Sequence, residues 1–170
     1  TAAGNLGPAP GSITAPGSSR KVITVGAGDL LEPRRGISGC GPTRDCVCKP
    51  DLVAPGKRLI SCAPGRSRKE YVVKSGTSMA APRVSGAVAL ALERVPDLTN
   101  VQAKMLLCES ARDLGLPRNR QGHGMLQTDR FLFFCEALCG SIKKKNEGKH
   151  LSSCKNCVNL WENTKKSGEF

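Results

Sequence analysis

The chain has 170 residues, which is enough for one domain with a sizeable core. Its 26 Lys and Arg residues outnumber its 14 Asp and Glu residues, so the formal net charge is +12. These cations are spread along the chain and aromatic residues make up only 4% of it, so the stacking platforms of a nucleic-acid-binding surface are lacking. Composition therefore predicts a solvated basic surface and no nucleic-acid partner.

The nine cysteines are an odd number, which argues against a closed disulfide framework. Their density suggests a reducing compartment or an anaerobic host. No apolar run approaches the length that spans a membrane, and no membrane partner is predicted. The chain starts at Thr1 with neither an initiator Met nor a signal peptide, and we interpret it as the interior of a longer protein whose destination stays unknown.

The first predicted elements are a strand end and a buried strand. Residues 1–5 resemble the end of a strand that breaks into a loop at Gly4-Asn5. Residues 11–17 have the composition of a surface loop. The run from Lys21 to Ala27 is β-branched and nearly continuous, which is typical of a strand buried in a parallel sheet.

Two short strands are predicted further along, at Leu59–Ser61 and Tyr71–Val73. Before them come Cys40 and the pair Cys46-x-Cys48. The spacing of that pair is too tight for the usual zinc knuckle, so we interpret these three cysteines as loop thiols.

The most informative stretch is Ser75–Gly86, which has the pattern of a turn that starts a helix. A hydroxyl of Thr77 or Ser78 can cap the first amide groups. Pro82 is tolerated only near the first turn, which places the helix start near Ser78.

Residues 84–92 are almost wholly small and apolar, which predicts a helix buried on all sides. Ser78 would then lie at the positive end of a buried helix, a setting that suits a nucleophile. The alternative is that Ser78 serves only as a helix cap.

A second helix is predicted to start at Thr99, which forms a capping box with Gln102, and to end at Gly115. Five apolar residues are expected on its core-facing side: Val101, Met105, Leu106, Cys108 and Leu114.

The sequence Gly-Thr-Ser-Met-Ala-Ala-Pro at residues 76–82, followed by Val84 and Gly86, resembles the nucleophile segment of the subtilisin-like serine proteases. Arg83 stands where that family usually has a non-catalytic His, and this departure concerns helix packing rather than the nucleophile. Other segments resemble the family in the same order, with Ile37 in place of a usual Phe: Ala2–Asn5, Val22–Ala27, Ser38–Pro42, Lys49–Gly56 and Gln121–Leu126.

The resemblance implies an α/β fold, the three-layer subtilisin-like fold with a mostly parallel sheet, of which residues 1–134 would be the C-terminal part. In such a sheet the loops carry the site at one edge. The implied nucleophile is Ser78, and the implied oxyanion-hole donor is Asn5. The implied substrate-binding residues are Ala3, Gly4, Gly76 and Thr77.

The resemblance also implies a general base, a His, and an orienting Asp, both upstream of the Asn5 segment. The two histidines of this chain, His123 and His150, lie downstream of Ser78. We therefore expect the chain to be inactive by itself and the longer protein to supply the missing groups. His123 is interpreted as an exposed turn residue.

Beyond Phe134 the resemblance fades, and residues 135–170 are predicted to form a poorly ordered basic tail. Its four cysteines could hold zinc, although the first pair is wider than usual for such a site: Cys135, Cys139, Cys154 and Cys157. We expect no zinc and no other cofactor, with calcium left open for the longer protein.

Three functions are consistent with these observations. The first is a serine endopeptidase that acts on protein or peptide substrates together with the missing half of its domain. The second is a non-catalytic relative that binds or regulates another protein. The third is a basic binding module centred on the tail.

Overall fold

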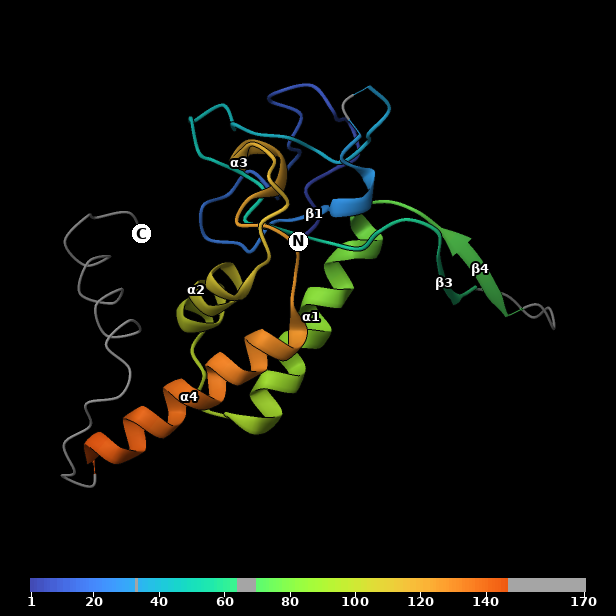
Figure 1. The fold of residues 1–170 in the computed structure, drawn as a ribbon. Coiled ribbons are helices and arrows are strands. Elements are labelled where there is room, and N and C mark those ends of the chain that lie inside the picture. The colour runs from blue at the N-terminus through green and yellow to red at the C-terminus, as the bar shows by residue number, and fades with distance from the viewer. Residues whose placement is uncertain (33, 64–69, 147–170) are drawn as a thin grey trace.

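The computed structural model describes residues 1–32, 34–63 and 70–146. The described part of the chain forms four α-helices and two pairs of strands, arranged as in Figure 1. The larger helices are α1 (Thr77–Arg94), α2 (Asn100–Ser110) and α4 (Thr128–Asn146), and α3 (Arg118–Gln121) is a single turn. A short 3-10 helix, η1 (Gly28–Leu30), follows the first strand.

The central sheet is built on the parallel pair β1 (Val25–Ala27) and β2 (Leu52–Ala54), with Val25 opposite Leu52. Single bridges extend it on both sides: Ala2 pairs in parallel with Val25, and Met125 pairs in parallel with Val53. The last bridge, between Arg112 and Met125, is antiparallel. The predicted α/β class with a mostly parallel sheet is confirmed.

Strand β1 is shorter than the predicted run of residues 21–27, because the chain turns at Lys21 and Val22. The carbonyl of Val22 accepts hydrogen bonds from two lysine ammonium groups, those of Lys49 at 3.0 Å and Lys104 at 3.2 Å. This carbonyl is therefore bonded to side chains, and regular pairing begins only at Val25.

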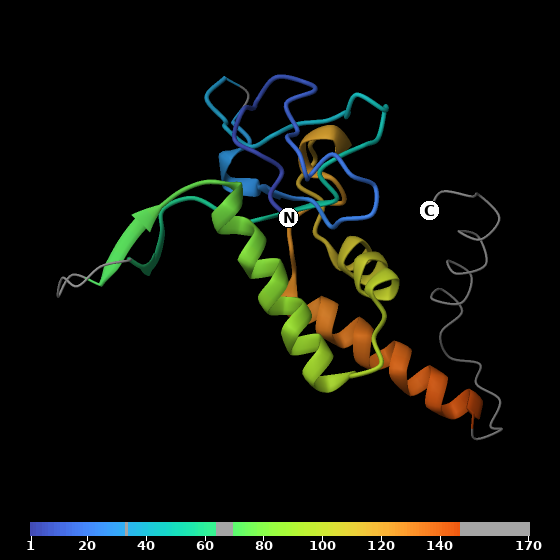
Figure 2. The ribbon, with the colours of Figure 1, turned by 180° about the vertical axis from the view of Figure 1, so that it is seen from behind.

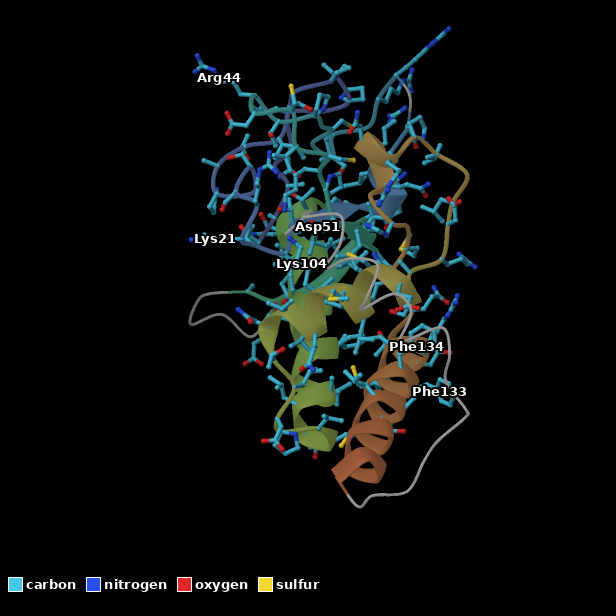
Figure 3. All side chains as sticks on the ribbon, turned by 90° about the vertical axis from the view of Figure 1, so that its left-hand side faces the viewer. Lys21, Arg44, Asp51, Lys104, Phe133 and Phe134 are labelled. Carbon is cyan, nitrogen blue, oxygen red and sulfur yellow. The ribbon has the colours of Figure 1, made fainter. Side chains whose placement is uncertain are left out.

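Those lysines belong to a buried ionic cluster around Asp51, which lies just before β2. The Lys49 ammonium is 2.7 Å from Asp51 Oδ2, and the Lys104 ammonium is 3.2 Å from Asp51 Oδ1. The N–H of Thr24 also donates to Asp51 Oδ2, at 2.6 Å. Burial lowers the pKa of Lys49 although the carboxylate of Asp51 opposes that shift. The cluster, of which Figure 3 labels Asp51 and Lys104, ties the start of β2 to the turn before β1 and to α2.

Helix α1 packs on the sheet with a buried stripe of small residues: Thr77, Ala80, Val84, Ala87 and Ala91. The prediction that it is buried on all sides is wrong for this chain. Ser85, Gly86, Ala89, Leu90 and Leu92 are exposed, because the described elements cover only one side of the helix. Arg83 is also exposed, so it takes no part in this packing.

The second strand pair is an antiparallel hairpin of β3 (Leu59–Cys62) and β4 (Tyr71–Lys74), with Leu59 opposite Lys74. Figures 1 and 2 show it projecting from the body beside the first turn of α1. Both strands match the predicted positions at residues 59–61 and 71–73. Its outer surface carries exposed Ile60 and Tyr71.

Helix α2 begins with the predicted capping box: Gln102 N–H donates to Thr99 Oγ1, and Thr99 N–H donates to the Gln102 side chain. The predicted end is wrong, because the helix stops at Ser110. Both backbone groups of Arg112 bond to Met125 and so continue the sheet.

The predicted inner face of α2 is partly wrong. Val101 is 48% exposed, and Leu114 lies in the loop that follows the helix. Leu106 is buried as predicted, and it is joined by three residues that were not predicted: Ala103, Leu107 and Ser110. This face packs against α4.

Helix α4 runs through the domain boundary that we predicted after residue 134. Cys135 is fully buried in the core, together with Phe131 of the same helix, whereas Phe133 points to solvent (Figure 3). The core therefore continues at least to Cys135. Among the described residues, no helix has both the length and the apolar character needed to cross a membrane. The predictions for residues 147–170 lie outside the described part.

Candidate active site

The candidate site lies where the first residues of the chain meet the start of α1. Residues 1–3 run beside β1, since Val25 N–H donates to the Thr1 carbonyl and Ala3 N–H donates to the Val25 carbonyl. Asn5 follows at the carboxyl end of this strand edge. Strand β2 leads in the same direction to Gly56, whose carbonyl accepts from Gly76 N–H at 2.8 Å. The site thus occupies the carboxyl edge of the parallel strands, as predicted for loops of such a sheet.

The Asn5 side chain is held by Thr77, 72 residues further along the chain. Asn5 Oδ1 accepts from Thr77 N–H at 2.9 Å and from the Thr77 hydroxyl at 3.1 Å. Because the carbonyl end of the amide is anchored in this way, the Nδ2 end is left as a donor without a partner among the described residues. Asn5 is exposed, so this donor is accessible.

Helix α1 is capped by a different residue from the two that the sequence predicted. The N-cap residue is Gly76, and neither Thr77 nor Ser78 caps the helix with its side chain. Asn5 does so instead, by accepting from the N–H of Thr77 at the first helical position. A sequence pattern that considers only neighbouring residues cannot reveal a cap from so distant a segment.

Ser78 is the second residue of α1, and it is exposed. Its hydroxyl makes no hydrogen bond within the described part of the chain. It lies next to Thr77, which binds Asn5, and at the helix end where the dipole favours negative charge. Ser78 therefore offers a hydroxyl without a hydrogen-bond partner in the described part of the chain, one residue after the Thr77 that anchors Asn5.

The other predicted site residues support this arrangement from within. Thr77 is fully buried, and its hydroxyl accepts from Gly4 N–H at 3.2 Å. The carbonyl of Gly4 accepts from Gly39, and Ala3 uses both of its backbone groups, with Val25 and Thr14. The N–H groups of Ala3 and Gly4 are thus engaged within the protein, and each of the two carbonyls already accepts one internal hydrogen bond.

Gly76 must be glycine for two geometric reasons. Its φ of +149° is a conformation that side chains disfavour. A Cβ atom there would also stand 3.2 Å from Asn5 Nδ2. Gly76 therefore permits the close approach of Asn5 to the helix start.

His123 lies at the opposite end of the sheet from Ser78. Its N–H donates to the carbonyl of Asp51, before β2, whereas the site adjoins Gly56, after β2. Five extended residues separate those points, which corresponds to about 16 Å. Desolvation and the adjacent Arg118 guanidinium lower the pKa of the exposed His123 ring. The interpretation of His123 as an exposed turn residue agrees with its position. His150 lies outside the described residues.

The seven cysteines in the described ranges are free thiols. Cys46, Cys48 and Cys62 are exposed, whereas Cys40 is buried and donates to the carbonyl of Ser38. Burial raises the pKa of Cys108 to about 12. Within those ranges, no three His, Cys, Asp or Glu side chains gather as a metal site would require. Cys154 and Cys157, half of the zinc alternative, lie outside them.

Residues 1–124 match the family described as the subtilase family of S8 peptidases. The chain belongs to the subtilase family. This match covers all the strands β1 to β4, α1, α2 and both partners of the Asn5–Thr77 contact, and it ends before α4. The recognition drawn from residues 76–86 is thereby confirmed.

Similar proteins carry protease names. Over 124 residues the chain is 40% identical to "Serine protease AprX" of Bacillus subtilis, covering 62% of this chain and 28% of AprX. Over 128 residues it is 36% identical to "Subtilisin Savinase" of Lederbergia lenta, covering 75% of this chain and 43% of Savinase. The solved structure of the Clostridium perfringens CspB protease matches with a TM-score of 0.64 and 32% identity, covering 77% of this chain and 30% of CspB. The chain thus spans less than half the length of these subtilases.

Proposed function

We propose that the full-length protein containing this chain is a serine endopeptidase in which Ser78 attacks the peptide carbonyl. Asn5 Nδ2 would donate to the oxyanion that forms. The general base and its orienting carboxylate would come from residues outside this chain, because His123 is bonded to Asp51 before β2 whereas the site adjoins Gly56 after it, points about 16 Å apart along the strand. The substrates would be proteins or peptides, as the names of the similar subtilases suggest.

The observation that carries this proposal is the double hydrogen bond from Thr77 to Asn5 Oδ1. It fixes the amide so that its Nδ2 donor has no partner among the described residues, and Ser78, with its unbonded hydroxyl, follows Thr77 directly in the chain. Pre-oriented donors of this kind stabilise charge that develops in the transition state without further reorganisation. A non-catalytic relative would have no chemical use for both the fixed donor and the free hydroxyl.

The test compares Ser78→Ala with Ser85→Ala in the full-length protein. Both serines are exposed on α1, and the Ser85 hydroxyl bonds only to the Ala81 carbonyl, one turn earlier. Ser78→Ala should abolish both casein digestion and labelling by a fluorophosphonate probe, whereas Ser85→Ala should retain both. Activity that survives Ser78→Ala, or an unmodified protein that neither digests nor labels, would contradict the proposal.

A further inference from the structure

The base of the β3–β4 hairpin carries two cations close to Ser78 in the fold. Lys74 ends β4 four positions before Ser78, and Arg58 precedes β3 directly. The Arg58 N–H donates to Ser75 Oγ at 2.8 Å, so both cations flank the short link into α1. Figure 2 shows this link running from the hairpin to the first turn of α1.

The orientation of Lys74 follows from the register of the hairpin. Lys74 is opposite Leu59, and Val72 is opposite Ser61, so these four residues share one face. Leu59 and Val72 are half-buried, whereas Ile60 and Tyr71 on the other face are 72% and 69% exposed. The face of Lys74 is therefore the one turned toward the body of the protein.

These two cations are not neutralised by the neighbouring acids. Both carboxylate oxygens of Asp29 accept backbone N–H groups, from Gly56 and Lys57 at 2.8 Å each. Glu32 lies 3.6 Å from the ammonium of Lys57. Within the described part of the chain, neither Arg58 nor Lys74 has an ion-pair partner, and both are exposed.

We propose that Arg58 and Lys74 make this site select peptides with acidic residues near the scissile bond, on the side that runs toward the hairpin. The inference rests on the proposed function of Ser78. The positive end of α1 adds to the potential of the two side chains. Because both cations are solvent-exposed, each should favour an acidic residue by only about two- to fivefold.

The experiment uses the full-length protein and peptides in which each of three positions on either side of the cleaved bond is Glu, Gln or Lys. Gln matches Glu in shape, so the ratio of their kcat/KM values isolates charge and cancels the amount of active enzyme. The expected ratio exceeds one at positions on one side only. It should fall toward one as salt rises to about 0.5 M, where screening shortens the reach of exposed charges.

Charge variants assign the effect to the two residues. The double variant with Arg58→Glu and Lys74→Glu should reverse the preference, so that Lys peptides are cleaved faster than Glu peptides. Replacing both by Gln should remove it, and this milder pair also covers the case in which charge reversal prevents folding. Arg44→Glu is the control, because Arg44 is exposed and the loop that precedes β2, blue-green in Figure 1, lies across the molecule from the hairpin.

The outcomes separate the two proposals. Cleavage with equal rates for Glu and Gln peptides at every position overturns the acidic preference and leaves the endopeptidase intact. A preference that Arg44→Glu alters as much as the hairpin variants do also overturns it, since net charge would then be the cause. Cleavage of no peptide overturns the endopeptidase, and the preference with it.

Discussion

At the scale of single residues, the buried hydroxyl of Thr77 connects three parts of the candidate site. It accepts from Gly4 N–H and donates to Asn5 Oδ1, while the N–H of Thr77 bonds to the same oxygen. A hydroxyl can accept and donate at once, which neither a methyl group nor an ammonium group in this place would do. Thr77 therefore acts through Asn5 as a positioning residue.

We predict that Thr77→Val lowers kcat for peptide hydrolysis by about tenfold to a hundredfold, because small displacements of a catalytic group cost that much. Val keeps the shape and burial of Thr77 but leaves Gly4 N–H unpaired and removes one bond to Asn5. Thr77→Ser keeps the hydroxyl and should restore most of the rate. Steady-state kinetics of the full-length protein check this, and equal loss in both variants would refute the role of the hydroxyl.

The ionic cluster of Asp51 gives a second prediction at this scale. Asp51→Asn should lower the free energy of unfolding by about 3–5 kcal/mol, because it leaves a buried ammonium without its counter-charge. That ammonium is Lys49, which is 1% exposed. Urea denaturation of the full-length protein measures the change.

The control for Asp51→Asn is Glu136→Gln, which breaks an exposed ion pair with Arg94 and should cost less than about 1 kcal/mol. If the free energy of unfolding falls by similar amounts in the two variants, burial does not set how much the Asp51 cluster contributes to stability.

At the scale of elements, α1 and α2 begin in different ways. The first amide groups of α2 are satisfied by its own capping box, whereas α1 depends on Asn5, which lies 72 residues earlier in the chain. Local hydrogen bonds of the first kind are visible in the order of residues. A cap from a distant segment forms only after the chain has folded. The start of α1 and the candidate site therefore depend on the same contact, that between Asn5 and Thr77.

We predict that Thr99→Ala destabilises the protein by about 1 kcal/mol through the loss of a capping hydroxyl. Thr99→Ser retains the acceptor for Gln102 N–H and should cost much less. Thermal unfolding of the full-length protein distinguishes them. If the midpoint of thermal unfolding decreases by the same amount in both variants, the hydroxyl of the capping box does not contribute to stability as the geometry indicates.

At the scale of the whole molecule, the described chain exposes several large apolar side chains. They lie on α1, on the hairpin and on α4: Leu90, Leu92, Ile60, Tyr71, Val73 and Phe133. Exposed apolar surface of this extent marks either an interface or a tendency to aggregate. Part of this apolar surface lies on α1, the helix that carries Ser78, so whatever covers that surface also contacts the helix of the candidate site.

We predict that the 170-residue chain, expressed by itself, self-associates and hydrolyses no peptide. Leu90→Glu should reduce the association, because it removes an apolar side chain that is 46% exposed and adds a charge. Ser85→Glu adds the same charge to an exposed position of α1 and should have less effect. Light scattering over a range of concentrations checks both. A monomeric chain at all concentrations would contradict the prediction.

Much of the fold could be predicted from residue order because the interactions concerned are local. The Thr99–Gln102 box spans three residues, and the strands at residues 59–61 and 71–73 follow from β-branched runs. The segment of residues 76–86 predicted the family, which the comparison confirmed. The roles of Ser78 and Asn5 themselves stay predictions, which the variants above test.

Tertiary structure decided the features that depend on distant partners. Strand β1 begins late because lysines 49 and 104 bind the Val22 carbonyl, and α2 ends early because Arg112 pairs with Met125. One side of α1 is exposed, although its sequence is apolar all round, because a helix is buried only where neighbours cover it. By itself the sequence determined which segments can form helices and strands, and it predicted which serine reacts. Which amide caps that helix was decided only when folding brought Asn5 to Thr77.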